Sequence, residues 1–139
     1  NVVFASVVPW NCLTPATNRA LYGDRAGDTG HGSEPMGSLN SEFFPDQMRM
    51  DLAEPSQIVR EYGAFDLSGP SRLKLNDVPV AFYQSYHEVT NNGVLGDPLL
   101  ASAERGKKMR GIIVKELVAI IKAFRELDTK VRPGLGQRF

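Results

Sequence analysis

The first eight positions of the chain form an almost continuous run of apolar and β-branched residues. Such a run, from Asn1 to Val8, is typical of a strand covered on both faces, as in a parallel sheet. A strand of this kind usually lies inside a sheet and needs neighbours on both sides. An edge strand or a chain trimmed at its start would also account for it. A split or processed chain, whose other half supplies the adjoining strands, is a further explanation of the pattern.

The C-terminal helix has the clearest pattern of all. Asp97 is its expected N-cap, with Pro98 in the first helical position. Gly106 and Gly111 weaken its first half by roughly 1 kcal/mol each relative to alanine, so we expect close packing there. Its apolar stripe recurs at intervals of three and four and consists of Met109, Ile112, Ile113, Leu117, Ile120, Ile121 and Phe124. We expect this helix to lie on a sheet or against a neighbour.

Weaker patterns predict the segments between these two ends. They are a helical turn (Thr14–Leu21), a glycine-rich loop up to Ser33, a short helix from Pro35 to Pro45, an ambiguous loop or helical turn (Val59–Phe65), and a strand from Val78 to Tyr83 that runs on toward Val89. Residues 1–127 are interpreted as the folded unit, and residues 128–139 as an extended tail with no pattern of its own.

Composition narrows the class of protein. A chain of 139 residues with 42% hydrophobic and 23% charged residues is typical of one globular domain. Sixteen basic and sixteen acidic residues cancel, which disfavours binding to nucleic acid or to an anionic membrane. The longest apolar stretch, residues 112–124, contains Lys115, Glu116 and Lys122 and is therefore no membrane span. Cys12 is the single cysteine, which fits a reducing compartment, so a cytoplasmic location is expected.

Candidate chemistry is concentrated in residues 27–38, a glycine-rich loop that leads into the predicted short helix. His31 is suited to move protons near neutral pH, and Glu34 is a candidate base or metal ligand. The loop lets the backbone approach a ligand closely, so Gly30, Gly32 and Ser33 are expected to bind substrate. The alternative is that His31 only makes hydrogen bonds and that Glu34 sits favourably at a helix start.

A second segment, residues 92–106, predicts a turn and a capped helix start, for which capping and packing are sufficient reasons. Its two runs, Gly93-Val94-Leu95-Gly96-Asp97-Pro98 and Ala101-Ser102-Ala103-Glu104-Arg105-Gly106, resemble the G-V-x-G-D-P and A-S-A-E-x-G signature of the creatininase family. Residues 31–38 are similar to that family's H-A-G-x-x-E-T-S motif. The resemblance extends from Val2 to about Leu127 and corresponds to the C-terminal half of the family's domain.

This resemblance implies an α/β fold, a three-layer α/β/α creatininase-like sheet of which only the C-terminal half is present in this chain. It also implies a hydrolase, dependent on zinc or manganese, that acts on cyclic or linear amides other than peptide bonds, and a higher homo-oligomer. The family's ligands lie mostly in an E-x-H pair, a following Asp and a G-H-x-x-N segment, none of which is present here. A second polypeptide is therefore expected to bring the N-terminal half and most of the metal ligands.

Carried over residue by residue, the resemblance makes His31 the proton-transfer residue and Trp10 a substrate-side aromatic. A core or interface role for Trp10 is equally compatible with its position. Met36 occupies the place of the motif glutamate, and a thioether is neither a base nor a good ligand for zinc or manganese. Glu34 lies two residues earlier and is the candidate to replace that carboxylate, as a catalytic group or metal ligand.

Three hypotheses follow from the sequence. The first is one chain of an amidohydrolase whose active site is shared with a second chain. The second, favoured by Met36, is a catalytically silent subunit that keeps the fold for assembly. A free-standing binding domain is the third, and it is disfavoured because the first strand would then expose an unpaired apolar edge.

Overall fold

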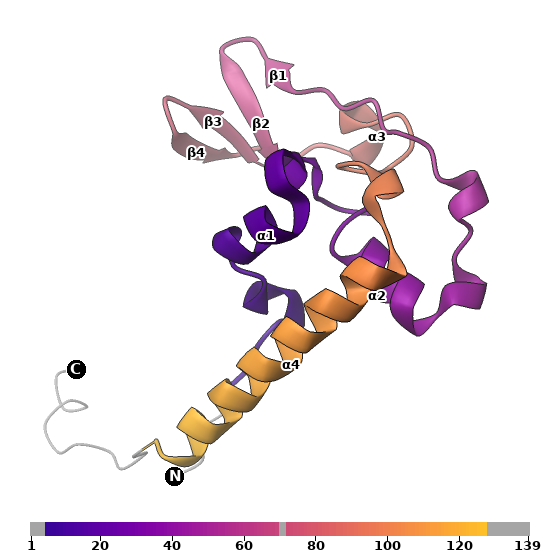
Figure 1. Cartoon of the computed structure of the whole chain (residues 1–139). Coiled ribbons are helices and arrows are strands. Elements are labelled where there is room, and N and C mark those ends of the chain that lie inside the picture. Colours follow the sequence, from indigo (N-terminus) through magenta and orange to yellow (C-terminus); the bar gives the residue numbers. More distant parts are fainter. Residues whose placement is uncertain (1–4, 70–71, 128–139) are drawn as a thin grey trace, which may run out of the picture.

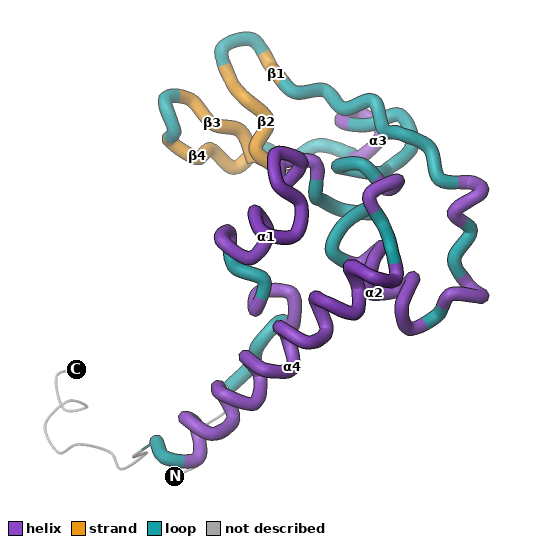
Figure 2. Tube along the Cα trace, viewed as in Figure 1, coloured by secondary structure: helices purple, strands orange, loops and turns teal. Residues whose placement is uncertain are grey.

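The computed structural model describes residues 5–69 and 72–127, and Figure 1 shows their arrangement. Short helices and loops pack around the first half of one long helix, and a small sheet lies beyond them; the second half of the long helix projects away from this body (Figure 1 and Figure 2). Helices and strands are α1 (Pro15–Tyr22), α2 (Met36–Phe43), β1 (Glu61–Tyr62), β2 (Phe65–Gly69), β3 (Arg72–Leu75), β4 (Val78–Ala81), α3 (Tyr86–Val89) and α4 (Ala103–Arg125). Five short 3-10 turns, η1 to η5, lie at Pro9–Cys12, Gly23–Asp28, Pro45–Gln47, Met50–Leu52 and Pro98–Leu100.

The long helix α4 begins later than the sequence pattern predicts. Asp97 does act as a cap, but of the 3-10 turn η5, where its side chain accepts a hydrogen bond from the amide of Leu99 at 2.8 Å. The chain then becomes extended at Ala101 and Ser102. The hydroxyl of Ser102 accepts from the amide of Arg105 and caps α4. Two capping signals lie five residues apart, and the second one starts the helix.

The core forms where α4 crosses α2. Gly106 meets the backbone of α2 so closely that a Cβ there would overlap the carbonyl of Ser38. The predicted close packing is confirmed at Gly106, whereas a Cβ at Gly111 would meet nothing within 4 Å. The buried hydrophobic cluster beside this crossing consists of Cys12, Leu13, Tyr22, Met109 and Ile113. Only the first half of the predicted apolar stripe is thus used in this core.

Both short helices predicted in the first part of the chain are confirmed. Thr14 caps α1 by accepting from the amide of Thr17, and Pro15 takes the first helical position. Helix α2 ends before Pro45, as the missing amide of proline requires. The predicted glycine-rich loop contains one 3-10 segment, η2.

The sheet is an antiparallel meander with the strand order β1-β2-β3-β4. The α/β class is confirmed, but these strands do not form the parallel sheet of a three-layer arrangement. The strand predicted from Val78 is confirmed as β4, although it ends at Ala81 and the chain then forms α3 instead of continuing extended.

The other three strands were not predicted. The expectation of a loop or helical turn at 59–65 is confirmed at residues 59–60 and 63–64, but residues 61–62 form β1 and Phe65 begins β2. Asn76 and Asp77 both have positive φ values, of 50° and 62°, which suits the two-residue turn between β3 and β4. Polar residues alternate with Phe65, Leu67 and Leu73 along β2 and β3, and this period of two is the signal for strands with one covered face.

The structure describes only residues 5–8 of the predicted first strand. Residues 1–4 lie outside the described residues. Residues 5–8 are exposed, have no regular secondary structure and join no ladder within the described part of the chain. They lie along the projecting half of α4, where they form one wall of an apolar groove. The predicted tail, residues 128–139, also lies outside the described residues. Among the helices of the described ranges, none combines the length and apolarity needed to cross a bilayer.

Candidate functional site

The loop that carries His31 is built by tight backbone turns. The amide of Ser33 donates to the carbonyl of Gly30 at 3.1 Å, and the amide of Gly30 donates to the carbonyl of Glu34 at 3.1 Å. Gly32 has a φ of +74°, a conformation that side chains with a Cβ rarely adopt. This closed turn leaves the His31 side chain exposed, and its ring lies against that of Tyr86 with 4.8 Å between the centroids.

The structure brings the two sequence motifs together, although they were interpreted separately. The carbonyl of His31 accepts from the amide of Leu95 at 2.7 Å, and the Ser33 hydroxyl lies 3.1 Å from the Leu95 carbonyl. A Cβ at Gly30 would overlap that same carbonyl. Gly96, with a φ of +110°, lies close to the Ser33 hydroxyl and to the backbone of residues 28 and 29. The glycines therefore let one loop lie directly on the other.

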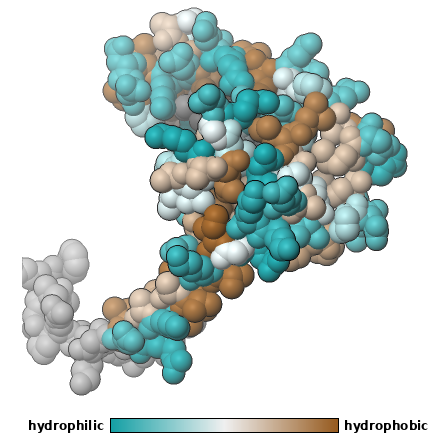
Figure 3. Space-filling view, viewed as in Figure 1, coloured by the Kyte–Doolittle hydropathy of each residue, from teal (hydrophilic) through white to brown (hydrophobic). Residues whose placement is uncertain are grey.

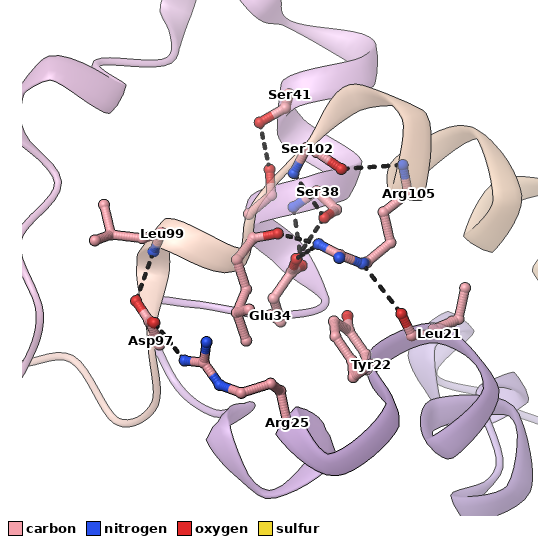
Figure 4. A network of polar contacts seen from close by, with 12 residues as sticks. Leu21, Tyr22, Arg25, Glu34, Ser38, Ser41, Asp97, Leu99, Ser102 and Arg105 are labelled. Carbon is pink, nitrogen blue, oxygen red and sulfur yellow. Dashed lines mark hydrogen bonds and ion pairs between the residues drawn. The ribbon is translucent and has the colours of Figure 1, made fainter.

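Glu34 is fully buried, with 1% of its surface exposed, and Figure 4 shows its contacts. One carboxylate oxygen accepts from the amide of Ser38 at 3.0 Å, and the other accepts from the Ser38 hydroxyl at 2.5 Å. A guanidinium nitrogen of Arg105 lies 3.5 Å from the second oxygen. Both carboxylate oxygens are therefore used at the start of α2, as expected of an acidic group at a helix N-terminus.

Two neighbours complete this buried network. The Ser38 hydroxyl also accepts from the amide of Ser102 at 3.0 Å, so it joins α2 to the start of α4. Tyr22 lies beneath the Arg105 guanidinium, 5.1 Å from the ring centroid. Burial first, and then the nearby charge of Glu34, raise the pKa of the Tyr22 phenol above its usual range, against an opposing effect of Arg105.

Arginines that the sequence interpretation did not single out hold the site together. Arg105 donates to the carbonyls of Leu100 and Leu21 as well as approaching Glu34. It lies within the second motif, so its place there was a usable signal. Arg25 bridges Asp28 at 2.5 Å and Asp97 at 2.6 Å, one carboxylate from each motif. This bridge is exposed, so it orders the loops more than it stabilises the fold.

A cavity of about 320 Å³ opens beside the His31 loop. Gly32 and Ser33, two of the predicted substrate-binding residues, line it. Its other walls come from Gly37, from the second motif and from residues 48–54, and they include Met48, Arg49, Met50, Leu52, Ala53, Glu54, Asn92, Val94, Pro98 and Ala101. Its volume falls at the lower end of the range for small-molecule sites, and its lining mixes apolar side chains with a few polar groups.

The remaining candidate residues lie elsewhere. Gly30 packs on Leu95 and is not among the residues that line this cavity. Trp10 belongs to η1, has 48% of its surface exposed and does not line the cavity either. Met36 is 42% exposed at the first turn of α2. The substrate-binding roles of Gly30 and Trp10 therefore stay predictions with no contact to this cavity.

The described residues do not fit a metal ion. No group of three or more His, Cys, Asp or Glu side chains in residues 5–69 and 72–127 is arranged to hold one. Glu34, the candidate ligand, has both oxygens occupied by hydrogen bonds and a guanidinium beside it. A cation there would meet the positive charge of Arg105 at short range.

Comparison with known proteins places the chain. The family model for creatininase, described as creatinine amidohydrolase, matches residues 3–121 of the 139. The chain belongs to the creatininase family. Searches of curated proteins and of solved structures found no match. Both motif loops, the cavity between them and most of α4 fall within the matched residues.

Membership in the creatininase family gives the activity a general class. Hydrolase activity of the amidohydrolase type is the function that this family suggests, and its members generally depend on metal ions. Within the chain, His31 is the candidate residue whose side chain is exposed next to the cavity-lining glycine and serine, whereas Glu34 is enclosed. The geometry thus separates two residues that the sequence interpretation had grouped as one catalytic pair.

Proposed function

We propose that this chain forms the proton-transfer side of an amidohydrolase site that cleaves the C–N bond of a small cyclic or linear non-peptide amide. The observation that carries the proposal is the exposed His31 imidazole. His31 does not itself line the 320 Å³ cavity, but it directly precedes Gly32 and Ser33, which do. Neither imidazole nitrogen has a hydrogen-bond partner within residues 5–69 and 72–127, so both are open to a ligand. A substrate in the cavity would present its leaving nitrogen to this side chain.

His31 acts in this scheme as the general acid. Water attacks the amide carbonyl, the C–N bond breaks, and the imidazolium gives its proton to the departing nitrogen. A proton supplied at that moment avoids the release of an amide anion, which is a very poor leaving group. Glu34 contributes by fixing the loop and the start of α2, since its carboxylate already holds Ser38 and approaches Arg105.

We further propose that a second polypeptide brings the metal ions, zinc or manganese, and that their chemistry activates the attacking water. The projecting half of α4 supports a partner there. Val114 and Val118 are exposed. They lie roughly 100° and 140° around the helix axis from the buried Ile113, so they point away from the face that packs on the core. Figure 3 shows hydrophobic residues continuing along this projecting part. Ile121, on the same part of the helix, has 59% of its surface exposed.

The shape of that surface favours an extended apolar strand as the contact of the partner. An apolar groove of about 550 Å³ lies between Ala5–Val7 and the side chains of Ile120, Ile121 and Phe124. The backbone groups of residues 5–7 have no hydrogen-bond partner within the described part of the chain. A strand laid beside them satisfies these groups and covers the apolar helix face together.

Isolation of the chain from its natural source tests the partner. A copurifying polypeptide with E-x-H, Asp and G-H-x-x-N segments supports a shared site, and one without such ligands contradicts the proposed source of the metal. Activity is tested in that complex with creatinine and a panel of small lactams and linear amides. His31→Ala should abolish turnover, and His87→Ala, an exposed histidine on α3, should not. Unchanged turnover in His31→Ala would defeat the proposal.

One observation favours a second candidate function, a catalytically silent subunit. Met36 stands in the motif position of the family's glutamate, and the nearest carboxylate, Glu34, is enclosed by hydrogen bonds. A silent subunit predicts that the complex assembles normally with His31→Ala and that its turnover is the same as that of the wild type.

A further inference from the structure

The orientation of the His31 imidazole has an unusual source. Histidines that act in catalysis are generally aimed by a hydrogen bond on the second ring nitrogen, which also sets the tautomer. Within residues 5–69 and 72–127, no such bond reaches His31. Its backbone is held through the amide of Leu95, but this leaves rotation about the side-chain bonds free. The contact that the structure shows for the imidazole ring is packing against an aromatic neighbour.

Tyr86 supplies that packing. The two ring centroids lie 4.8 Å apart with an angle of 43° between the planes, within the range of favourable aromatic pairs. Both side chains are otherwise exposed, so the ring of Tyr86 is the surface against which the imidazole packs. The Tyr86 hydroxyl makes no hydrogen bond within the described residues, so the ring itself makes the contact.

Tyr86 lies on the short helix α3, which is held in place by hydrogen bonds at both ends. Ser85 and Glu88 form a capping box at the start of α3, with the amide of Ser85 donating to the Glu88 carboxylate at 2.9 Å. Val89, at the end of α3, is fully buried. Its carbonyl accepts from the amide of Val59 at 2.8 Å, and Thr90 bridges to the same segment.

We infer that Tyr86 is a positioning residue, whose ring limits the directions that the His31 imidazole takes when it meets the substrate. This inference rests on the proposed function, because the imidazole needs a fixed direction only if it transfers a proton. The contribution comes from the ring face rather than the hydroxyl. Phenylalanine should therefore replace Tyr86 without loss, and an aliphatic side chain should not.

Nuclear magnetic resonance of the histidine rings tests the contact directly. The chain has two histidines, so His87→Gln assigns both sets of imidazole signals. The ring current of Tyr86 should displace the His31 signals, the displacement should persist in Tyr86→Phe, and it should vanish in Tyr86→Leu. Identical His31 signals in the wild type and Tyr86→Leu would overturn the positioning role.

Kinetics of the assembled enzyme provide the second readout. Tyr86→Leu should lower kcat by about tenfold to a hundredfold with KM nearly unchanged, as expected when a reacting group loses its orientation. Tyr86→Phe should keep the kcat of the wild type. Tyr83→Leu, at a position that is 87% exposed, is the matched control and should leave both constants unchanged. An equal kcat in Tyr86→Leu and the wild type would refute the inference.

The two readouts separate this inference from the proposed function. Displaced His31 signals with no turnover of any amide by the wild-type assembly would remove the proposed function, and with it the need to position His31. Turnover that depends on His31 but not on the residue at position 86 would remove only the role of Tyr86.

Discussion

Two glycines of α4 provide a test of how this helix meets the rest of the molecule. Gly106 and Gly111 are five residues apart in one helix, and both cost helical stability relative to alanine, by about 1 kcal/mol. A Cβ at Gly106 would overlap the Ser38 carbonyl, which is backbone and cannot move aside alone. A Cβ at Gly111 would meet no atom within 4 Å. The same substitution should therefore have opposite effects.

Gly111→Ala should stabilise the chain by about 0.5–1 kcal/mol, the gain in helix propensity alone. Gly106→Ala has the same gain but forces α2 and α4 apart, and overpacking of this kind costs about 1–3 kcal/mol. We expect a net loss of about 1 kcal/mol, so the two variants should differ by about 2 kcal/mol.

Urea unfolding followed by circular dichroism measures this difference. For a slope of about 2 kcal/mol per molar urea, the two midpoints should be separated by about 1 M. Stabilisation of similar size in both variants would show that α4 does not contact α2 at Gly106, and the network around Glu34 would lose its structural basis.

Three further predictions concern side chains on either side of this crossing. Ser38→Ala removes a donor to a buried carboxylate and should cost about 2–3 kcal/mol of unfolding free energy, whereas Ser41→Ala, which loses one bond to a helix carbonyl, should cost less than about 1 kcal/mol in the same urea assay. The pKa of the Tyr22 phenol is raised in the folded chain, so as pH rises the unfolded chain loses the phenol proton first. The free energy of unfolding should therefore fall as pH rises above about 10. Unfolding measured across alkaline pH should show a less steep fall in Tyr22→Phe. Thermal unfolding should give Val118→Asp a free energy of unfolding within about 0.5 kcal/mol of the wild type, because Val118 is exposed. Ile113→Asp should be less stable by more than about 3 kcal/mol, because Ile113 is buried. Equal losses in the two variants would mean that Val118 is covered.

Local signals in the sequence predicted α1, α2 and α4 well, whereas α3 was expected to be part of a strand. Proline and threonine at the start of α1, and the spacing of apolar residues in α2 and α4, depend only on neighbours along the chain. The start of α4 was misplaced because Asp97 and Ser102 both carry capping signals, and only tertiary contacts of Ser102 with Ser38 distinguish them.

The sheet was predicted less well, because its short strands are exposed on one face or both. β4 is exposed along its length, and β1 has two residues, so neither carries a strong hydrophobic period. Short strands of this kind are specified by their turns, and the Asn76-Asp77 turn was the signal available.

The candidate site shows a similar division. The loop of His31 and the second motif were each found from their residues, yet nothing in either pattern revealed that Leu95 would join them. The burial of Glu34 was equally hidden, since its enclosure depends on Arg105, which lies 71 positions away along the chain. Long-range pairings of single side chains leave no periodic trace in a sequence.

The dependence of His31 on the leaving group tests the central claim most directly. Turnover of an alkyl amide and of a matched activated ester should be compared in the assembled enzyme with wild-type His31 and with His31→Gln. A general acid contributes about a hundredfold to ten-thousandfold when the leaving group needs a proton, and little when it does not. We predict a loss of that size for the amide and nearly unchanged turnover of the ester. An equal loss for both substrates, or none for either, would contradict proton transfer by His31.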